Sequence, residues 1–224
     1  MSNSMYTPFN EVHLKGKIFK ILNQKHYTDI LLSVGHGPEW RLPKDKNGRY
    51  IRDIVRVRFI EGDSKNAIAS FKEGDKVSIG AVTQTAIDVL TNRSKKTVLF
   101  GFTVSPMKEK EFDMNKFTIV GKIESAKAVS DKYIIINIKS NVEKKIKNTR
   151  ESSETPYFIK NFKGLVSFGI RINDGSAKDL VYTKYTPGTW ISASGYIQGR
   201  KNKQNMQEMR LITTKHEIVG QVQK

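Results

Sequence analysis

Positively charged and aromatic side chains are interleaved along the whole of this 224-residue chain. Trp40 is followed directly by Arg41, and Tyr196 lies four residues before Arg200. A cationic side chain can neutralise a phosphate, and an aromatic ring can stack on a planar base. The two kinds of side chain together could therefore hold a flexible polyanion that carries planar groups.

The candidate contacts divide by their chemistry. The rings predicted to stack are Tyr27, Trp40, Tyr133 and Tyr196. The cations predicted to neutralise phosphates are Lys15, Lys17, Arg41, Arg52, Arg56, Arg58, Arg93, Lys95, Lys122, Lys139, Arg200, Lys201 and Lys203. A tyrosine at the edge of a strand could instead pack in a core with only its hydroxyl at the surface. Trp190, which precedes an isoleucine, is predicted to pack in this way.

The chain carries a large positive charge. It has 39 lysine and arginine residues against 22 acidic ones, which gives a net charge of +17 and an isoelectric point near 9.9. Residues 1–108 hold 18 basic and 10 acidic side chains, and residues 109–224 hold 21 and 12. Because the surplus is spread over both halves, it predicts a polyanionic partner for the whole surface.

The composition argues against several classes of protein. No cysteine is present and the four histidines are scattered, so neither a disulfide framework nor a metal site is expected. No apolar run approaches the ~20 residues of a membrane helix, and residues 1–10 do not resemble a signal peptide. No phosphate-binding loop, catalytic triad order or acidic cluster suggests catalysis. We expect a soluble, cytoplasmic binding protein without a cofactor, and not an enzyme.

One stretch of the sequence occurs twice. Residues 10–18 read NEVHLKGKI and residues 115–123 read NKFTIVGKI, an offset of 105 residues. The Asn, Gly, Lys and Ile recur in register, with an apolar residue at both inward positions between them. A repeat of half the chain length indicates duplicated domains, which we place at residues 1–108 and 109–224.

Alternation of apolar and polar residues predicts the strands of each half. In the first half they are at 10–18, 27–34, 54–60, 76–81 and 98–104. In the second half they are at 117–123, 133–139, 165–172, 190–198 and 208–214. A helix precedes the fourth strand of each half, capped by Asp63 or Ser64 in the first and spanning 174–184 in the second. Gly16 predicts a bulge or bend that lets the first strand serve two sheet faces.

Five strands with a helix between the third and fourth is the plan of the OB-fold, a small Greek-key barrel. The expected fold is therefore all-β with short helices, built as two tandem five-stranded OB-fold barrels. Within that class the sequence resembles the single-stranded-DNA-binding proteins of bacteria and their phages. The resemblance rests on the Asn and Gly-Lys of both repeats, and on the motifs Trp40-Arg41, VRVRF at 55–59, FKEGDKV at 71–77 and GYIQGR at 195–200.

This resemblance implies sequence-nonspecific binding and protection of single-stranded DNA during replication, recombination or repair. The ligand would cross the second and third strands of each barrel and the loops beside them, where the candidate cations and rings fall. A homo-oligomer, and replication or recombination proteins as partners, are compatible with the family.

The sequence departs from the family at three points. Ile54 stands where the family places an aromatic residue before the third-strand cation, and Asn202 lies near an aromatic position of the last hairpin. The sequence ends without the acidic tail that recruits partner proteins to cellular members, so recruitment by that route is not expected. These departures favour a phage or mobile-element protein, or a specialised paralogue, over a housekeeping one.

Two other classes of binding protein stay open at the level of the sequence. The same barrel and the same stacking chemistry serve RNA, so an RNA-binding OB-fold protein is the first alternative. The second is a scaffold that docks partners within a replication complex. Competition among single-stranded DNA, RNA and duplex would separate a DNA-binding protein from an RNA-binding one. A protein that binds no oligonucleotide at low salt would favour the scaffold.

Overall fold

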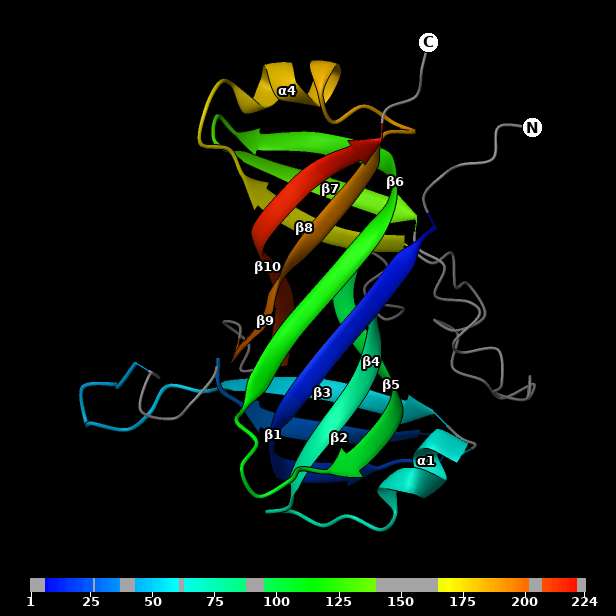
Figure 1. Ribbon diagram of the computed structural model, residues 1–224, viewed down its shortest axis with the longest axis vertical. Coiled ribbons are helices and arrows are strands. Elements are labelled where there is room, and N and C mark those ends of the chain that lie inside the picture. Colours follow the sequence, from blue (N-terminus) through cyan, green and yellow to red (C-terminus); the bar gives the residue numbers. More distant parts are fainter. Residues whose placement is uncertain are drawn as a thin grey trace.

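The computed structural model describes residues 7–25, 27–36, 43–60, 63–87, 95–139, 165–201 and 207–220. Within these ranges the protein is all-β with two short helices (Figure 1). The elements of the N-terminal half are β1 (Phe9–Asn23), β2 (Tyr27–Val34), β3 (Asp53–Ile60), α1 (Asp63–Ile68), β4 (Lys76–Ile87) and β5 (Lys95–Pro106). Those of the C-terminal half are β6 (Met114–Ser130), β7 (Tyr133–Lys139), β8 (Leu165–Arg171), α4 (Ala177–Thr183), β9 (Trp190–Lys201) and β10 (Gln207–Gly220). The predicted order of strands and helices is confirmed.

The first five strands close into a barrel. β1 pairs antiparallel with both β2 and β4, β2 pairs with β3, and β4 pairs with β5. A short parallel contact between β3 and β5, which includes Val57 opposite Leu99, completes the ring. The residues that alternate inward along these strands, such as Val12, Leu14 and Leu32, are fully buried and form the core.

β1 changes partners around Gly16, which pairs with β4 on one side and with β2 on the other. A Cβ atom at this position would meet the carbonyl oxygen of Ser33 at 2.3 Å. The register of β1 against β2 then shifts between Ile18 and Lys20. The predicted bend of the first strand is therefore confirmed, and its cause is the close approach of the two backbones.

The same pairings recur in the C-terminal half. β6 pairs antiparallel with β7 and β9, β7 with β8, and β9 with β10. The parallel contact is Ile212 of β10 with Gly169 of β8. Gly121 takes the place of Gly16, since a Cβ atom there would meet the carbonyl oxygen of Lys139 at 2.6 Å. The repeat in the sequence thus corresponds to a repeat in strand pairing.

β1 and β6 lie side by side and antiparallel, and their pairing joins the ten strands into one sheet. Figure 1 shows the two strands crossing the middle of the molecule, with β2 and β3 toward one end and β7 and β8 toward the other. Most of the buried apolar side chains of both halves belong to one cluster, and Ile60, Val82 and Phe100 form a second, smaller one. The halves therefore share backbone hydrogen bonds and core packing.

The two helices are short and lie against the strands of their own half. α1 buries Ile68 and packs on β3 and β5, while α4 buries Ala177 and packs on β6 and β7. Figure 1 shows α4 at one end of the long axis. Over the described part of the chain, neither helix has the length and apolar character needed to cross a membrane.

Candidate nucleic-acid interface

Two sheet surfaces carry the outward residues of the strand pairs that an OB-fold uses to bind oligonucleotides. The β2–β3 face presents Tyr27, Asp29, Leu31, Ser33, Ile54, Arg56 and Arg58. The β7–β8 face presents Tyr133, Ile135, Asn137, Lys139, Leu165, Ser167, Gly169 and Arg171.

On the β2–β3 face, Arg58 is held by an acidic partner. Its Nε and Nη2 groups donate to the two carboxylate oxygens of Asp29, at 2.7 and 2.8 Å. The two residues stand directly opposite each other in register, and the Asp29 side chain is only 6% exposed. A carboxylate bound in this bidentate way takes the geometry that a phosphate would take on the same guanidinium.

The same guanidinium covers Tyr27. The Cζ atom of Arg58 lies 3.7 Å from the centre of the Tyr27 ring, within the range of a cation–π contact. Arg56 is the more exposed arginine of this face, with 40% of its side chain exposed and its Nε 4.0 Å from Asp29. Its backbone N–H faces the sulfur of Met209 in β10 at 3.3 Å. Tyr27, a predicted stacking ring, and Arg58, a predicted phosphate contact, are therefore already in contact with each other.

The β7–β8 face is more open, and the cations among its described side chains have no carboxylate beside them on the face. Tyr133 is 39% exposed and Ile135 36% exposed. Tyr133 stands opposite Arg171, and its ring extends over Gly169, where a Cβ atom would lie 1.8 Å from the tyrosine Oη. Arg171 and Lys139 are exposed near the two ends of the face. The outward side chains of β7 and β8, all described, include no carboxylate.

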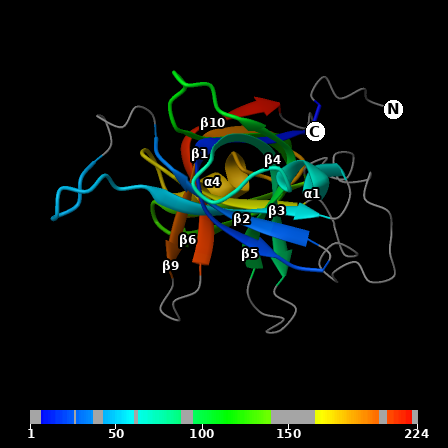
Figure 2. The same ribbon diagram turned by 90° about the horizontal axis from the view of Figure 1, so that it is seen from below.

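Each half reaches across to the binding strands of the other. The backbone N–H of Gly199 in β9 donates to Oδ1 of Asp53 in β3 at 3.1 Å. In the same manner, the backbone N–H of Ser167 in β8 donates to Oγ1 of Thr85 in β4 at 2.8 Å. Figure 2 shows the end of β9 and the start of β5 on the same side of the molecule. A ligand that follows either face would therefore meet strands of the other half.

Lys122 and Lys139 form a basic pair at the edge between β6 and β7. They stand directly opposite in register, and both side chains are exposed. The Lys122 Nζ also lies 5.6 Å from the ring centre of Trp190, which is buried, as predicted. Like charges in directly opposed positions destabilise a sheet. A bound phosphate would relieve this repulsion, so the structure brings two predicted phosphate contacts together here.

The linker between β5 and β6 is fastened to the N-terminal half by two carboxylates. Glu111 accepts a hydrogen bond from Lys15 Nζ at 2.8 Å, which lowers the pKa of Glu111 below its usual value, helped by a backbone N–H of the linker. Asp113 accepts from the Arg52 guanidinium and from the backbone N–H of Gly35, the latter at 2.9 Å. Lys15 and Arg52 are thus both engaged by acidic residues of the linker.

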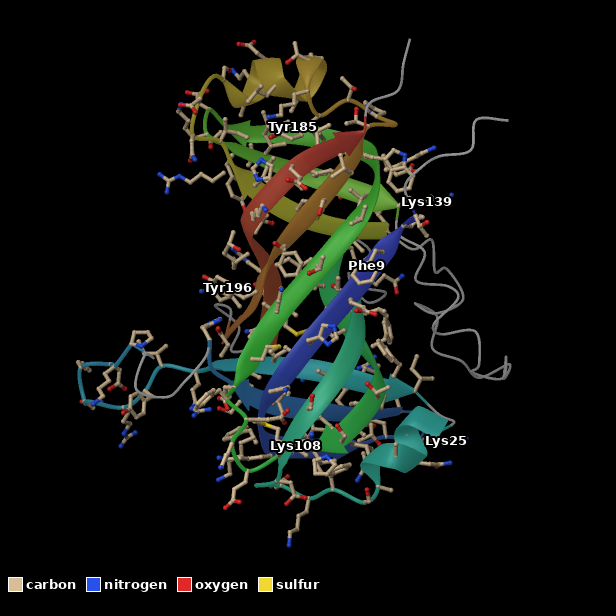
Figure 3. The ribbon with its side chains drawn as sticks, viewed as in Figure 1. Phe9, Lys25, Lys108, Lys139, Tyr185 and Tyr196 are labelled. Atoms are coloured by element: carbon tan, nitrogen blue, oxygen red, sulfur yellow. The ribbon has the colours of Figure 1, made fainter. Side chains whose placement is uncertain are left out.

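Tyr196 meets a histidine of the N-terminal half. The ring centres of Tyr196 and His36 lie 4.5 Å apart at an interplanar angle of 72°, and His36 Nε2 lies 2.9 Å from Asp53 Oδ2. A cavity of about 410 Å³ beside these rings is also lined by Asp113 and Lys116. Figure 3 shows Tyr196 midway along the molecule, far from Tyr185 at one end. The structure therefore places Tyr196 at the contact between the halves.

A pair of titratable side chains, the buried Tyr185 and the half-buried His216, lies away from both faces. Tyr185 is 1% exposed, and its Oη lies 3.0 Å from Nε2 of His216. Burial raises the pKa of Tyr185, while burial and then the charge of Lys184 lower the pKa of His216. The pair joins the segment after α4 to β10. Among the residues that the structure describes, no three His, Cys, Asp or Glu side chains are grouped so that they could hold a metal ion.

The remaining predicted contacts are placed only in part. Lys17 is exposed on β1 opposite Ser33. Described by their backbone alone, at the ends of strands, are Lys95, Arg200 and Lys201. Outside the described residues lie Trp40, Arg41, Arg93 and Lys203. The binding role of every candidate residue stays a prediction.

Sequence analysis did not identify the residues that decide how these side chains are presented. Asp29 binds the arginine that covers Tyr27, and Gly169 leaves room for the ring of Tyr133. Asp113 and His36 each contact residues of the other half. Only Gly169 carried a sequence signal, since a glycine inside a strand indicates a bulge or a close approach. The partners of the other three depend on strand register and on contacts between distant segments.

Comparison with known proteins adds a likeness of fold. No protein-family model matches the chain, and neither does any curated protein. The solved structures that it resembles include the wild-type single-stranded DNA binding protein from Thermus aquaticus, with a TM-score of 0.61 at 10% identity over 98% of this chain and 97% of that one. A deletion mutant of the same protein gives a TM-score of 0.59 at 10% identity over 98% of each chain. At this identity the likeness shows a common fold alone.

Proposed function

We propose that this protein binds single-stranded DNA without sequence preference, through two tandem OB-fold domains at residues 1–108 and 109–224. The observation that carries the proposal is the β7–β8 face, where Tyr133 and Ile135 are exposed on the same surface as Lys139 and Arg171. Exposed rings accompanied by cations are what single-stranded nucleic acid requires of a binding surface. The net charge of +17 and the fold likeness to a single-stranded DNA binding protein support the proposal.

Two interactions would hold the strand. Bases stack on exposed rings, which contributes roughly 1–3 kcal/mol per base and tolerates any sequence because every base has a π-face. Lysine and arginine side chains neutralise phosphates, and the logarithm of affinity falls by about 0.7 per phosphate for each tenfold rise in salt. Binding should therefore be sequence-tolerant and weakened by salt, and duplex DNA, whose bases are already stacked, should bind less well.

In the cell, we propose, this binding protects single strands during DNA replication, recombination or repair. The protein would act in the cytoplasm, that of a bacterial host if a phage encodes it, as a binding protein rather than an enzyme and without a cofactor. Assembly into a homo-oligomer, or contact with replication or recombination proteins, would add to this function.

A titration of fluorescein-labelled oligonucleotides tests the function. Each OB-fold covers ~4–16 nucleotides, so a dT oligomer of roughly 30 nucleotides spans both proposed domains. We expect the dT oligomer to bind at least about tenfold more tightly than a duplex of equal length, and to weaken as sodium chloride rises from about 50 to 300 mM. Tighter binding of an rU oligomer than of the dT oligomer would favour an RNA-binding protein, and no binding at low salt would favour a scaffold.

A further inference from the structure

We infer that the two faces have different tasks: the β7–β8 face stacks bases on a ring that Gly169 allows into place, whereas on the β2–β3 face Asp29 neutralises Arg58 and so keeps this cation and the Tyr27 ring occupied. This inference rests on the proposed function and adds which half of the chain contacts the bases. It follows from aligning the two faces. Lys17 stands opposite Ser33, and its copy in the repeat, Lys122, stands opposite Lys139.

In this alignment Tyr27, the first residue of β2, corresponds to Tyr133, the first residue of β7. Asp29 then corresponds to Ile135. Arg58 stands opposite Asp29 in β3. Gly169 stands opposite Ile135 in β8. The ion pair of one face is therefore replaced, at the same two positions of the other face, by an isoleucine and a glycine.

Asp29 competes with phosphates for the arginines of its own face. Its two oxygens fill the fork of Arg58, and one of them also lies 4.0 Å from Nε of Arg56. Because the carboxylate is almost fully buried, separating it from Arg58 would leave a buried charge uncompensated. The guanidinium in turn lies on the ring of Tyr27. Cation and ring are both occupied before any ligand arrives.

The β7–β8 face has the opposite arrangement. Gly169 has no side chain, so the Tyr133 ring can lie over the backbone of β8, with its Oη, Cζ and Cε1 atoms all within 2.8 Å of the place that a Cβ atom would take. The ring rests against the sheet and is still 39% exposed. Ile135 adds exposed apolar surface beside it.

The difference decides where a base can stack. In the described part of the chain no cation or ring stacks on Tyr133, whereas a base at Tyr27 must compete with the guanidinium of Arg58. Arg171 stands opposite Tyr133, so it can neutralise a phosphate that flanks the stacked base, while Lys139, at the far end of β7, can neutralise a phosphate farther along the DNA strand. The C-terminal half therefore contacts bases, and the β2–β3 face contributes little to base stacking.

The two tyrosines are matched probes of this division. We expect Tyr133→Ala to weaken binding of the dT oligomer by between about five- and 150-fold, the equivalent of one stacked base, and Tyr27→Ala to weaken it by less than about threefold. Because a tyrosine carries no charge, the slope of log affinity against log salt should be the same in both variants as in the parent protein. An equal loss, or a larger loss from Tyr27→Ala, would overturn the inference.

Gly169 and the tyrosine hydroxyl give two further tests of the ring. Gly169→Ala adds one methyl group where the Tyr133 ring lies, so it should displace the ring and weaken binding by at least about fivefold. Thr183→Ala, at an exposed position of α4 outside both faces, is the control and should bind like the parent. Tyr133→Phe keeps the π-face and should bind within about twofold of the parent. Full affinity in Gly169→Ala would contradict the positioning role of this glycine.

A substitution at Asp29 should raise the affinity for the dT oligomer instead of lowering it. Asp29→Asn removes the charge that neutralises Arg58, so binding should tighten and the salt slope should steepen by about 0.7, one added phosphate contact. The double variant Asp29→Asn with Arg58→Gln replaces the ion pair by two neutral amides and should bind like the parent, which tests the same point if the single variant is unstable. A double variant with a salt slope shallower by about 0.7 would show that Arg58 contacts phosphate, against the inference.

Failure of this inference can be told from failure of the proposed function. If the parent protein binds no dT oligomer, the proposed function is wrong. If the parent binds the dT oligomer and Tyr27→Ala costs at least as much affinity as Tyr133→Ala, the function stands and the division of tasks is wrong.

Discussion

Val12 of β1 pairs with Phe117 of β6 at the centre of the seam between the two halves, and Phe117 is also the copy of Val12 in the sequence repeat. The pairs on either side follow the same rule. Leu14 pairs with Asn115, which is the copy of Asn10. Asn10 in turn pairs with Ile119, which is the copy of Leu14. A strand that meets its own copy in this way makes the self-complementary contact of a two-fold dimer within a single chain.

The asparagine that begins each repeat fastens the seam strand to the fourth strand of its own half. Asn10 exchanges two hydrogen bonds with the backbone of Thr83, at 2.7 and 3.0 Å. Asn115 does the same with Ile197, at 2.7 and 2.9 Å. Both asparagines are buried. Changing either to alanine would leave a buried N–H and a buried C=O unsatisfied, so Asn10→Ala and Asn115→Ala should each lower the free energy of unfolding by about 2–4 kcal/mol.

Urea unfolding followed by circular dichroism measures these losses. His13→Ala, an exposed position on the same strand, is the control and should change the free energy of unfolding by less than about 0.5 kcal/mol. The two asparagine variants should lose similar amounts, because their environments match. A variant that behaved like the control would show that its asparagine does not fasten the strand.

Gly16 and Gly121 should tolerate alanine equally poorly. The added Cβ would lie 2.3 Å from the carbonyl oxygen of Ser33 in one case and 2.6 Å from that of Lys139 in the other. Both obstacles are backbone atoms of a paired strand, so the strand itself must shift, at a cost of about 1–3 kcal/mol. Gly16→Ala and Gly121→Ala should both have lower thermal unfolding midpoints than the parent protein. Lys17→Ala, at the position next to Gly16, is the control and should keep the parent midpoint. An unchanged midpoint in Gly16→Ala would mean that β1 does not depend on this close approach.

Most of the fold could be predicted from the sequence, because it depends on local alternation. The strands at 27–34 and 133–139 are predicted at their observed bounds, since every second residue is buried and, except for Thr28, apolar. β1 and β6 instead run on past the predicted ends, to Asn23 and Ser130, where half-buried and exposed residues pair along β2 and β7. The pairing of β1 with β6 left no trace in the alternation, because it is made by backbone atoms at the strand edges.

The candidate site could be predicted only as far as residue type. The sequence indicates that Arg58 and Tyr27 lie on an outward face, and they do. It does not indicate that Asp29 fills the guanidinium fork, because that contact depends on the register of β2 against β3. Likewise Tyr196 is a plausible stacking ring in the sequence, and its contact with His36 exists only because the two halves are packed together.

Asp113 should hold the linker in place. Its carboxylate accepts hydrogen bonds from Arg52 and from the backbone N–H of Gly35, and only 12% of its side chain is exposed. Asp113→Ala removes both bonds, each worth about 1.5 kcal/mol or more because the acceptor is charged, so the linker should open at least about tenfold more often. Trypsin cleavage after Lys108 and Lys110 reports this opening, because proteolysis follows the population of the open form.

Ser105 supplies the control for the linker, because it is exposed, lies just before the linker and does not flank either cleavage site. Ser105→Ala leaves the Asp113 bonds in place, so its trypsin cleavage rate should equal that of the parent protein. If Asp113→Ala were cleaved no faster than Ser105→Ala, the linker would be held by its backbone and by Glu111 with Lys15.

His216 should make the fold sensitive to mild acid. Burial, with the nearby charge of Lys184, lowers its pKa from 6.5, so the folded chain takes up this proton less readily than the unfolded chain does. Its contribution to stability is therefore complete above pH 6.5 and is lost as the pH falls through the lowered pKa. The urea midpoint should drop between pH 7.5 and pH 5.5, and His216→Gln, whose amide oxygen can still accept from Tyr185, should reduce that drop. His13→Gln, at an exposed position, is the control and should keep the full pH dependence of the parent. If His216→Gln also kept it, the Tyr185–His216 pair would not be the cause of the acid sensitivity.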